Sequence, residues 1–162
     1  MTETIYLAAG CFWGVQWYFD QIDGVVETEV GYQGGSVDSP TYEQVCTHTT
    51  GHAESTKVVY DTSKTSTEKI LRNFFVMHNP TQLNRQGPDV GDNYRTEIFY
   101  TTDEQKDMAE KLIAELQPKF DQPIVTKVTK APTFWPAEDY HQKFTERTGR
   151  GMCHVDPSEV KI

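Results

Sequence analysis

An α+β fold in a single domain is the class that the sequence predicts, on three observations. Short apolar runs typical of strands alternate along the chain with longer stretches whose apolar residues recur at helical spacing. The chain has 162 residues, which is enough to bury one hydrophobic core. Hydrophobic residues make up 36% of it and aromatic residues 12%, a globular rather than a disordered composition.

The first half of the chain predicts a helix between two strands, followed by a third strand. Residues 5–8 form a short apolar run that ends at Gly10 and is typical of a buried strand. From Phe12 onward apolar residues recur at helical spacing, and Gly24 is a natural stop for this helix. Residues 25–32 alternate as a strand does, and residues 56–60 supply another strand.

The second half predicts two longer helices separated by a strand. Thr65 followed by Glu68 fits a capping box, which would open a helix with a strongly apolar face. Thr102 with Gln105 would cap the second helix in the same way, and Pro118 would end it. The remaining predicted elements are a strand over 96–100, a strand over 124–128 and a short helix over 138–145.

In chain order these elements give β-α-β-β-α-β, with additions at the C-terminal end. This is the split βαβ arrangement of a ferredoxin-like sandwich with a C-terminal extension, in which helices cover one face of the sheet. Three segments have no regular pattern, namely 33–51, 79–94 and 149–162. Irregular connections of this length inside a compact domain are usually functional, so we expect the site among them.

The net charge disfavours two classes of partner. The chain has 24 acidic and 15 basic side chains, a formal net charge of -9. Such a surface repels the phosphates of nucleic acids and anionic membranes, so neither is an expected partner. No apolar run approaches the roughly 20 residues that a membrane helix needs, and the N-terminus lacks the pattern of a signal peptide. We therefore expect a cytoplasmic protein.

Three cysteines, Cys11, Cys46 and Cys153, lie far apart in the sequence. They are too few for the disulfide framework of a secreted protein, so each is either an inert core residue or a reactive thiol. Cys11 falls where a strand ends and a helix begins, and the positive end of a helix favours a thiolate. That effect contributes at most about 2 kcal/mol, enough to leave roughly half of the thiol ionised near neutral pH.

The neighbours of Cys11 favour a reactive thiol over a small residue that fills a tight turn. Phe12 and Trp13 follow directly, where a solvent-facing first turn would normally hold polar residues. Gly10 and Gly14 flank the run and allow close backbone approach. A thiolate beside two aromatic rings is typical of a nucleophile at the edge of an apolar pocket.

Gly-Cys-Phe-Trp-Gly at 10–14 resembles the signature of the A-type peptide methionine sulfoxide reductases. Further blocks similar to this family follow in family order at 31–35, 41–46, 50–54, 86–89, 94–96 and 134–142. The resemblance spans the chain from about residue 4 to about residue 145. It implies the family's fold, in agreement with the split βαβ pattern. It also implies thiol-dependent reduction of methionine S-sulfoxide, free or in proteins, without a cofactor.

The resemblance assigns roles to four residues around the departing oxygen. Glu54 matches the general acid, which could protonate the sulfoxide oxygen if burial keeps its carboxyl neutral. Tyr42 and Tyr94 match positions whose hydroxyls would donate hydrogen bonds to that oxygen, and Asp89 matches an acceptor behind them. Asp92 is left out because its position varies in the family pattern. The residues alone also allow a solvated glutamate at the end of a strand and two tyrosines of the core.

Phe12 and Trp13 are expected to hold the S-methyl group of the substrate by apolar contact. His141, in the predicted C-terminal helix, matches a hydrogen-bonding residue at the edge of the pocket. A structural histidine is the other interpretation of His141.

Oxygen left on Cys11 as a sulfenic acid would condense readily with a second thiol. Cys153 is the expected resolving cysteine, because two glycines let the tail bend and Arg150 favours a thiolate. Cys46 is expected to be a buried structural thiol, although it could substitute for Cys153.

Many members of the family have a longer glycine-rich tail with one or two recycling cysteines, and this tail has one. A Cys11–Cys153 disulfide would then be reduced directly by thioredoxin. We expect residues 1–162 to form a single catalytic domain, active as a monomer, in which 149–162 is a flexible tail.

Two other classes of function remain open on the residues alone. Cys46, His48 and His52 are ligand-like side chains at close spacing, which suits zinc, although no Cys-x-x-Cys pair is present and no metal is expected. A cysteine hydrolase would use Cys11 as nucleophile and His141 as base. The chain is short for such a papain-like fold.

Overall fold

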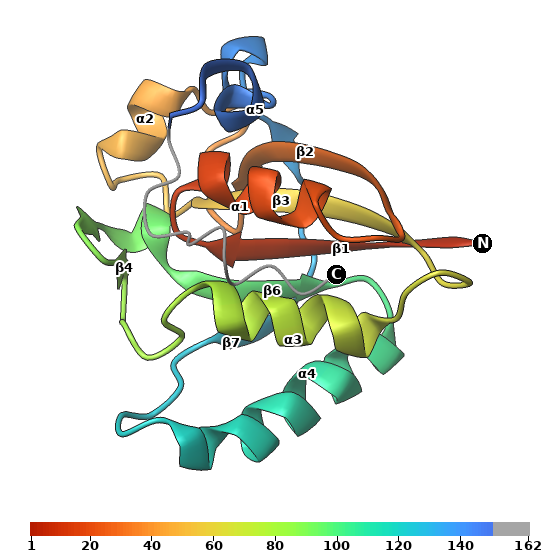
Figure 1. Ribbon diagram of the computed structural model, residues 1–162. Helices are drawn as coiled ribbons and strands as arrows, with labels where there is room; N and C mark the ends of the chain where they lie inside the picture. Colours follow the sequence, from red (N-terminus) through yellow and green to blue (C-terminus); the bar gives the residue numbers. More distant parts are fainter. Residues whose placement is uncertain (151–162) are drawn as a thin grey trace.

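The computed structural model describes residues 1–150, which form a six-stranded sheet with helices packed against it (Figure 1). The strands are β1 (Thr2–Ala9), β2 (Val25–Gln33), β3 (Ala53–Asp61), β6 (Thr96–Tyr100), β7 (Lys127–Lys130) and β8 (Trp135–Pro136). They lie in the order β7-β6-β1-β3-β2-β8, and every neighbouring pair is antiparallel except β6 with β7. The inner strands β6-β1-β3-β2, with α1 (Phe12–Asp20) and α3 (Thr67–Met77), form the predicted split βαβ unit. The predicted fold class is therefore confirmed.

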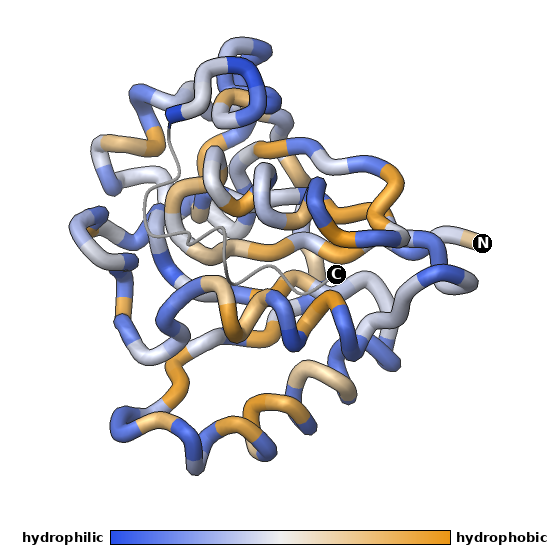
Figure 2. The backbone as a smooth tube through the Cα atoms, viewed as in Figure 1, coloured by the Kyte–Doolittle hydropathy of each residue, from blue (hydrophilic) through white to orange (hydrophobic). Residues whose placement is uncertain are grey.

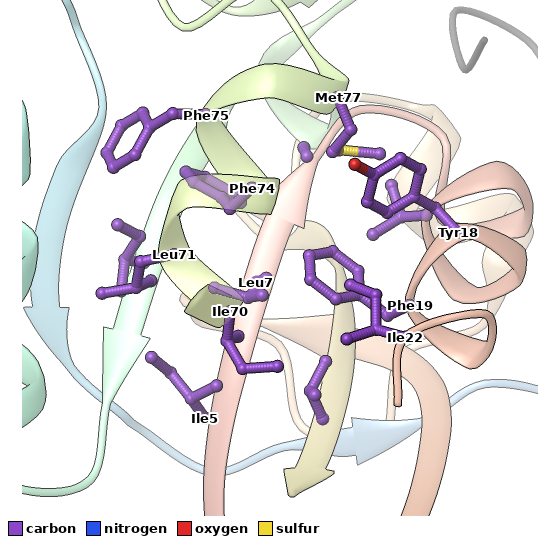
Figure 3. Close-up of a cluster of buried hydrophobic side chains, with 14 of the residues drawn as sticks. Ile5, Leu7, Tyr18, Phe19, Ile22, Ile70, Leu71, Phe74, Phe75 and Met77 are labelled. Atoms are coloured by element: carbon purple, nitrogen blue, oxygen red, sulfur yellow. The ribbon is translucent and has the colours of Figure 1, made fainter. Parts of the chain in front are cut away.

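Helices α1 and α3 bury their apolar faces against one side of the central strands. Phe19 of α1 and Ile70 and Phe74 of α3 point toward Ile5 and Leu7 of β1, and all five side chains are fully buried (Figure 3). Each such side chain contributes roughly 1.5–3 kcal/mol by leaving water. This cluster fixes α1, and with it the end of the helix that follows Cys11.

Helix α4 (Asp103–Leu116) packs against α3 rather than directly on the middle of the sheet (Figure 1). Ala109 and Leu112 are its fully buried apolar residues, and Figure 2 shows apolar and polar turns alternating along it. The opposite face of the sheet has a smaller cluster of Ala8, Ala53 and Phe99. Phe134 covers Tyr6 on that side, with ring centroids 5.1 Å apart.

The two predicted capping boxes have different outcomes. Thr102 caps α4 as expected, since its side chain accepts a hydrogen bond from the Gln105 N–H at 3.2 Å. The cap of α3 is Ser66, whose hydroxyl accepts from the Lys69 N–H at 3.1 Å, so the prediction of Thr65 was wrong by one residue. Thr65 belongs to the turn after β3, because its own N–H bonds to the carbonyl of residue 61.

Two predicted elements near the C-terminal end are displaced. The strand expected over 124–128 is β7, Lys127–Lys130, because residue 124 is held by the side chain of Gln117 before the strand begins. The helix expected over 138–145 is a 3₁₀ turn, η3 (Asp139–His141), followed by α5 (Phe144–Thr148). Lys143 separates the two with a left-handed φ of 57° that a continuous helix cannot contain.

The segments predicted to be irregular contain short elements. Residues 33–51 include α2 (Tyr42–Cys46), which Thr41 and Gln44 open with a capping box. Residues 79–94 include the hairpin strands β4 (Arg85–Gln86) and β5 (Asp89–Val90) and the 3₁₀ turn η1 (Asp92–Tyr94). The 3₁₀ turn η2 (Gln117–Lys119) follows α4. The tail expected over 149–162 lies outside the described residues from 151 onward.

The C-terminal end of β1, helix α2 and strand β4 all lie at the same end of the molecule (Figure 1). The two predicted site segments that can be described, 33–51 and 79–94, therefore lie at the end of the molecule where α1 begins. Through residue 150, none of the helices has the length and apolar character needed to cross a bilayer.

Candidate active site

Cys11 is the N-cap residue of α1, directly after β1, as the sequence predicts. Gly10 has a left-handed φ of 91°, which lets the chain turn sharply from strand into helix. The Cys11 residue is only 7% exposed, so it is largely shielded from solvent. The backbone N–H groups of the first helical turn favour negative charge at this position.

Glu54 lies on β3 and is 1% exposed, so the alternative of a solvated glutamate at the end of a strand is wrong. Its Oε1 accepts a hydrogen bond from the N–H of Phe12 at 3.2 Å, which places the carboxyl at the N-terminus of α1. Its Oε2 accepts from Asn93 Nδ2 at 3.4 Å. Burial favours the neutral acid, whereas the Phe12 N–H favours the carboxylate.

The N-terminus of α1 therefore serves two acidic groups, Cys11 and Glu54. Two negative charges in one buried site repel each other, so ionisation of one group favours the neutral form of the other. With one negative charge on the pair, the charge lies either on Cys11 or on Glu54. In the first case a thiolate lies beside a neutral carboxyl. This arrangement pairs a nucleophile with a proton donor.

Tyr94 ends the turn η1 and lies within electrostatic reach of Glu54, Cys46, Asp89 and Cys11. Burial raises the pKa of Tyr94 well above its ordinary value, and these acidic neighbours raise it further. The hydroxyl therefore remains a hydrogen-bond donor throughout the physiological pH range.

Tyr42, the first residue of α2, also lies within electrostatic reach of Glu54 and of Tyr94. Burial raises the pKa of Tyr42 strongly, with further contributions from its hydrogen bond to Cys46 and from Glu54 and Tyr94. The structure thus brings Tyr42, Tyr94 and Glu54 together from three separate segments. Neither tyrosine is an ordinary member of the main hydrophobic core.

An aromatic wall forms beside this acidic group. Trp13 Nε1 donates a hydrogen bond to Nδ1 of His141 at 2.9 Å, and Trp13 stacks on Phe144 with ring centroids 4.0 Å apart. The His141 ring also lies 5.3 Å from that of Phe12 and 4.5 Å from that of Tyr42. His141 is therefore a neighbour of both predicted substrate-binding aromatics.

His141 is 1% exposed, and burial lowers its pKa below the ordinary histidine value. The neutral ring can accept the indole N–H at Nδ1, whereas a protonated ring cannot. A hydrolase would need His141 as the base for Cys11, but here Nδ1 is engaged by Trp13. This geometry favours a role in orienting Trp13.

Glu138 and Tyr32 belong to the site but received no role in the sequence prediction. The Tyr32 hydroxyl donates to Glu138 Oε1 at 2.8 Å, and the Tyr42 N–H donates to Oε2 at 3.0 Å. Burial opposes ionisation of Glu138, but these hydrogen bonds outweigh it and the pKa is lowered. The carboxylate thereby ties α2 to β2. Both residues lie inside the sequence blocks 31–35 and 134–142, and this position was the one feature of the sequence that could have indicated a role for them.

Asn93 is a third residue of the site to which the sequence assigned no role. It is fully buried between Asp89 and Tyr94 in the chain, and it contacts the Glu54 carboxyl. Asp89 lies on β5, and its buried Oδ2 has no hydrogen-bond partner among the described residues. Burial raises the pKa of Asp89, so its carboxyl is easier to protonate than that of an exposed aspartate.

The two remaining cysteines differ in what can be said of them. Cys46 is partly buried on α2, and burial raises the pKa of its thiol, which fits the predicted structural role. Cys153, the expected resolving cysteine, lies outside the described residues.

The zinc interpretation depends on Cys46, His48 and His52. His52 accepts a hydrogen bond from the Gly35 N–H at Nδ1, and its Nε2 lies 2.6 Å from the Val37 carbonyl, so both ring nitrogens are used in the loop. Within residues 1–150, no group of three or more His, Cys, Asp or Glu side chains is arranged to hold a metal ion.

A cysteine at a helix terminus beside a buried carboxyl, with His141 engaged by Trp13, fits a thiol-dependent reductase better than a hydrolase. The family model described as peptide methionine sulfoxide reductase matches residues 3–161, and the chain belongs to that family. It is an enzyme that reduces methionine sulfoxide.

Individual relatives agree with this assignment. A protein of Pasteurella multocida, named peptide methionine sulfoxide reductase MsrA, is 55% identical over 144 residues, covering 89% of this chain and 83% of its own length. The structure of methionine sulfoxide reductase A of Corynebacterium diphtheriae superimposes with a TM-score of 0.88 at 34% identity, covering 93% of this chain and 76% of that one. Saccharomyces cerevisiae Mxr1, solved in complex with Trx2, shares the fold with a TM-score of 0.62 at 23% identity, covering 88% and 84% of the two chains.

Proposed function

We propose that this enzyme reduces the S epimer of methionine sulfoxide, free or within proteins, with Cys11 as the nucleophile and Glu54 as the proton donor. The observation that supports this assignment is the hydrogen bond from the Phe12 N–H to Glu54. It places a buried carboxyl beside the residue that follows Cys11, at the helix end where a thiolate is favoured.

In the first step the Cys11 thiolate attacks the sulfur of the sulfoxide while Glu54 protonates its oxygen. The oxygen is transferred to Cys11, which becomes a sulfenic acid, and methionine is released. Two electrons pass from the cysteine sulfur to the substrate sulfur, so no further reductant is needed in this step. Tyr42 and Tyr94 would donate hydrogen bonds to the oxygen as negative charge develops on it.

Phe12 and Trp13 would hold the S-methyl group of the substrate against their rings. His141 supports that role because it accepts the indole N–H and so fixes the plane of Trp13. Asp89, close to Tyr94, would make the side of the pocket that faces the sulfoxide oxygen more polar. A pocket with one apolar and one hydrogen-bonding side can distinguish the two epimers of a sulfoxide.

In the second step the thiol of Cys153 would displace water from the Cys11 sulfenic acid and form a Cys11–Cys153 disulfide. A thioredoxin dithiol would reduce this disulfide and regenerate both thiols. The yeast protein Mxr1, solved with Trx2, is a relative for which such a partner is known. The proposal includes one catalytic domain with a tail over 149–162 that can bend, acting in the cytoplasm as a monomer.

Cys11→Ser tests the proposal against the matched variant Cys46→Ser. Purified enzyme would receive the separated S and R epimers of methionine sulfoxide with dithiothreitol as reductant, and methionine would be quantified. Cys11→Ser should form no methionine, whereas wild type and Cys46→Ser should consume the S epimer. Methionine formation by Cys11→Ser, or consumption of the R epimer alone, would overturn the assignment.

A further inference from the structure

We propose that Arg95 is a positioning residue for this reaction, because it clamps the turn η1 that holds Asn93 and Tyr94 in the site. The inference rests on the proposed function for its kinetic consequences, but the clamp itself can be tested without activity. Arg95 contacts neither the thiol nor the acid in the described structure, so its effect would be indirect.

The clamp consists of two hydrogen bonds from the Arg95 guanidinium. Nε donates to Glu97 Oε1 at 2.8 Å, and Nη1 donates to the carbonyl of Asp92 at 2.9 Å. The Asp92 carbonyl also accepts the Arg95 backbone N–H at 3.3 Å, so one side chain closes the turn on itself. The side chains of Arg95 and Glu97 are only 13% and 6% exposed, which strengthens their attraction relative to a surface pair.

The anchor of this clamp is the sheet. Glu97 is buried on β6, and its Oε2 accepts a hydrogen bond from Thr129 on β7 at 2.7 Å. The turn is therefore tied through Arg95 and Glu97 to two paired strands rather than to another loop. A charged pair with its remaining acceptor satisfied can hold a fixed geometry in a way that a solvated arginine cannot.

The turn places two side chains on the reacting groups. Asn93 donates to the Glu54 carboxyl, and Tyr94 lies within electrostatic reach of Glu54 and Cys11. Both residues are within two positions of Arg95 in the chain. A displacement of η1 by even 1 Å would move the hydrogen bond on the acid and the donor for the sulfoxide oxygen together. Displacements of that size can cost about 10²-fold in rate.

The space around the guanidinium is matched to arginine. A Cβ added at Gly34, at the end of the β2 segment, would lie 2.8 Å from Arg95 Nη2, so the arginine packs directly on glycine backbone. Gly34 also has a left-handed φ of 89°, which a larger residue would disfavour. Lysine keeps the charge of Arg95 but offers a single nitrogen, and one nitrogen cannot span Glu97 and the Asp92 carbonyl as the fork does.

A double-mutant cycle between Arg95→Lys and Tyr94→Phe tests the clamp. The measured quantity is the single-turnover rate of methionine formation from methionine sulfoxide, together with KM. Arg95→Lys should slow the wild-type reaction at least about tenfold while KM changes less than about threefold. In the Tyr94→Phe background it should cost clearly less than in the wild type, because the Tyr94 hydroxyl is already absent and only the contact of Asn93 with Glu54 is still disturbed. Equal losses in both backgrounds, or no loss in the wild type, would overturn the proposal.

Arg72→Lys is the matched control, because Arg72 also forms a forked pair with a carboxylate, Glu115, but on α3 and α4 away from the site. It should leave the rate unchanged. Glu97→Gln is a second test of the clamp should Arg95→Lys fail to fold, since it keeps the shape of the anchor and removes its charge. It should slow the same step, and an unchanged rate would contradict the proposal.

Hydrogen exchange separates the clamp from the proposed function. The amides of Tyr94 and Arg95 donate to the carbonyls of Gly91 and Asp92, so Arg95→Lys should accelerate their exchange while amides of β3 stay protected. Unchanged exchange at 94 and 95 would refute the clamp even if the enzyme reduces methionine sulfoxide. Faster exchange in a protein without that activity would refute the proposed function and leave the clamp standing.

Discussion

Cys11 and Glu54 lie at the same helix terminus, so the proposed nucleophile and the proposed proton donor lie in one site. The positive end of α1 lies beside both groups, and the Phe12 N–H in its first turn donates to the Glu54 carboxyl. Because the two acidic groups repel each other when both are charged, the arrangement favours one negative charge on the pair. Substrate that draws this charge to Cys11 would leave Glu54 protonated and ready to donate.

Glu54→Gln tests the acid directly. The amide oxygen can still accept the Phe12 N–H, but the side chain no longer supplies an acidic proton. General acid catalysis typically contributes 10²–10⁴-fold, so the single-turnover rate should fall at least about 10²-fold. The thermal midpoint should stay close to that of the wild type. A rate within twofold of wild type would rule out the proposed role.

His141, as the proposed partner of Trp13 at the substrate pocket, should make KM depend on pH. Its pKa is lowered by burial, so the neutral ring that accepts the Trp13 indole is favoured in the folded protein. This stabilisation is present above the ordinary histidine pKa of 6.5 and is lost as the pH falls through the lowered value. We expect KM to rise several-fold on the acidic side of 6.5, while His141→Asn, whose amide oxygen accepts without titrating, removes that rise. The measurement is KM as a function of pH for the wild type and for His141→Asn. Parallel profiles of the two proteins would contradict the role of His141.

Residue-scale prediction succeeded where a motif was present and failed where only tertiary structure gives a residue its partner. The position of Cys11 followed from the end of a strand, a helical pattern and flanking glycines. The burial of Glu54 could not be read from a strand whose next residues are also polar, because a strand end can face either side. Asn93 has no sequence signal, since its contact with Glu54 depends on a turn that forms through Arg95 and Glu97.

At the scale of elements, the segment that includes η3 and α5 completes the aromatic wall. Lys143 between them is fixed on α1, because its backbone N–H donates to Gln16 at 2.7 Å and its Nζ lies 2.8 Å from Asp20. The side chain of Gln142 accepts a hydrogen bond from the Val30 N–H and donates one to the Val30 carbonyl, as a neighbouring strand would do at this edge of β2. These contacts hold His141 and Phe144 against Trp13.

Lys143→Ala should therefore weaken substrate binding more than it weakens the fold. The Lys143 side chain is 39% exposed, so its pair with Asp20 contributes no more than about 1 kcal/mol to stability. We expect a small decrease in the free energy of unfolding and a rise of about threefold or more in KM. Lys106→Ala, which removes the surface pair with Glu110 on α4, should leave KM unchanged. Equal KM values for the two variants would show that the contact does not orient the wall.

Long elements were predictable because each shows its periodicity over several turns or pairs. The helix α2 was missed because its five residues are too few to show a helical period, although Thr41 and Gln44 form a capping box. The helix predicted over 138–145 was broken by Lys143, whose left-handed φ results from its contacts on α1 and β2 rather than from its own residue type. The sequence therefore predicted the type of the longer elements, whereas tertiary contacts determined where the elements begin and end.

At the scale of the whole molecule, the sheet brings the site segments to one end. The order of the central strands places β3, with Glu54, between β1 and β2, so the acid lies beside the helix that leaves β1. The order β-α-β-β-α-β predicted this arrangement, but the parallel addition of β7 and the edge pairing of β8 had no local signal. The strand order therefore brings the Glu54 carboxyl close to Cys11.

The proposed catalytic cycle also depends on Cys153, which lies outside the described residues. Cys153→Ser should form about one methionine per enzyme in the absence of a small-molecule thiol, because the sulfenic acid on Cys11 then has no resolving partner. Thioredoxin should not restore multiple turnovers. Many turnovers by Cys153→Ser with thioredoxin as the sole reductant would show that Cys46 or direct reduction completes the cycle.

Mass spectrometry of the enzyme after reaction with methionine sulfoxide in the absence of a reductant shows directly which cysteines take part in the reaction. Free thiols would be alkylated, and the protein would be digested under non-reducing conditions. We expect one methionine formed per chain, the loss of two thiols, and a single disulfide joining the peptides that contain Cys11 and Cys153, with Cys46 alkylated. Recovery of alkylated Cys11 alongside stoichiometric methionine would contradict this expectation, because the oxygen would then have been removed by another residue.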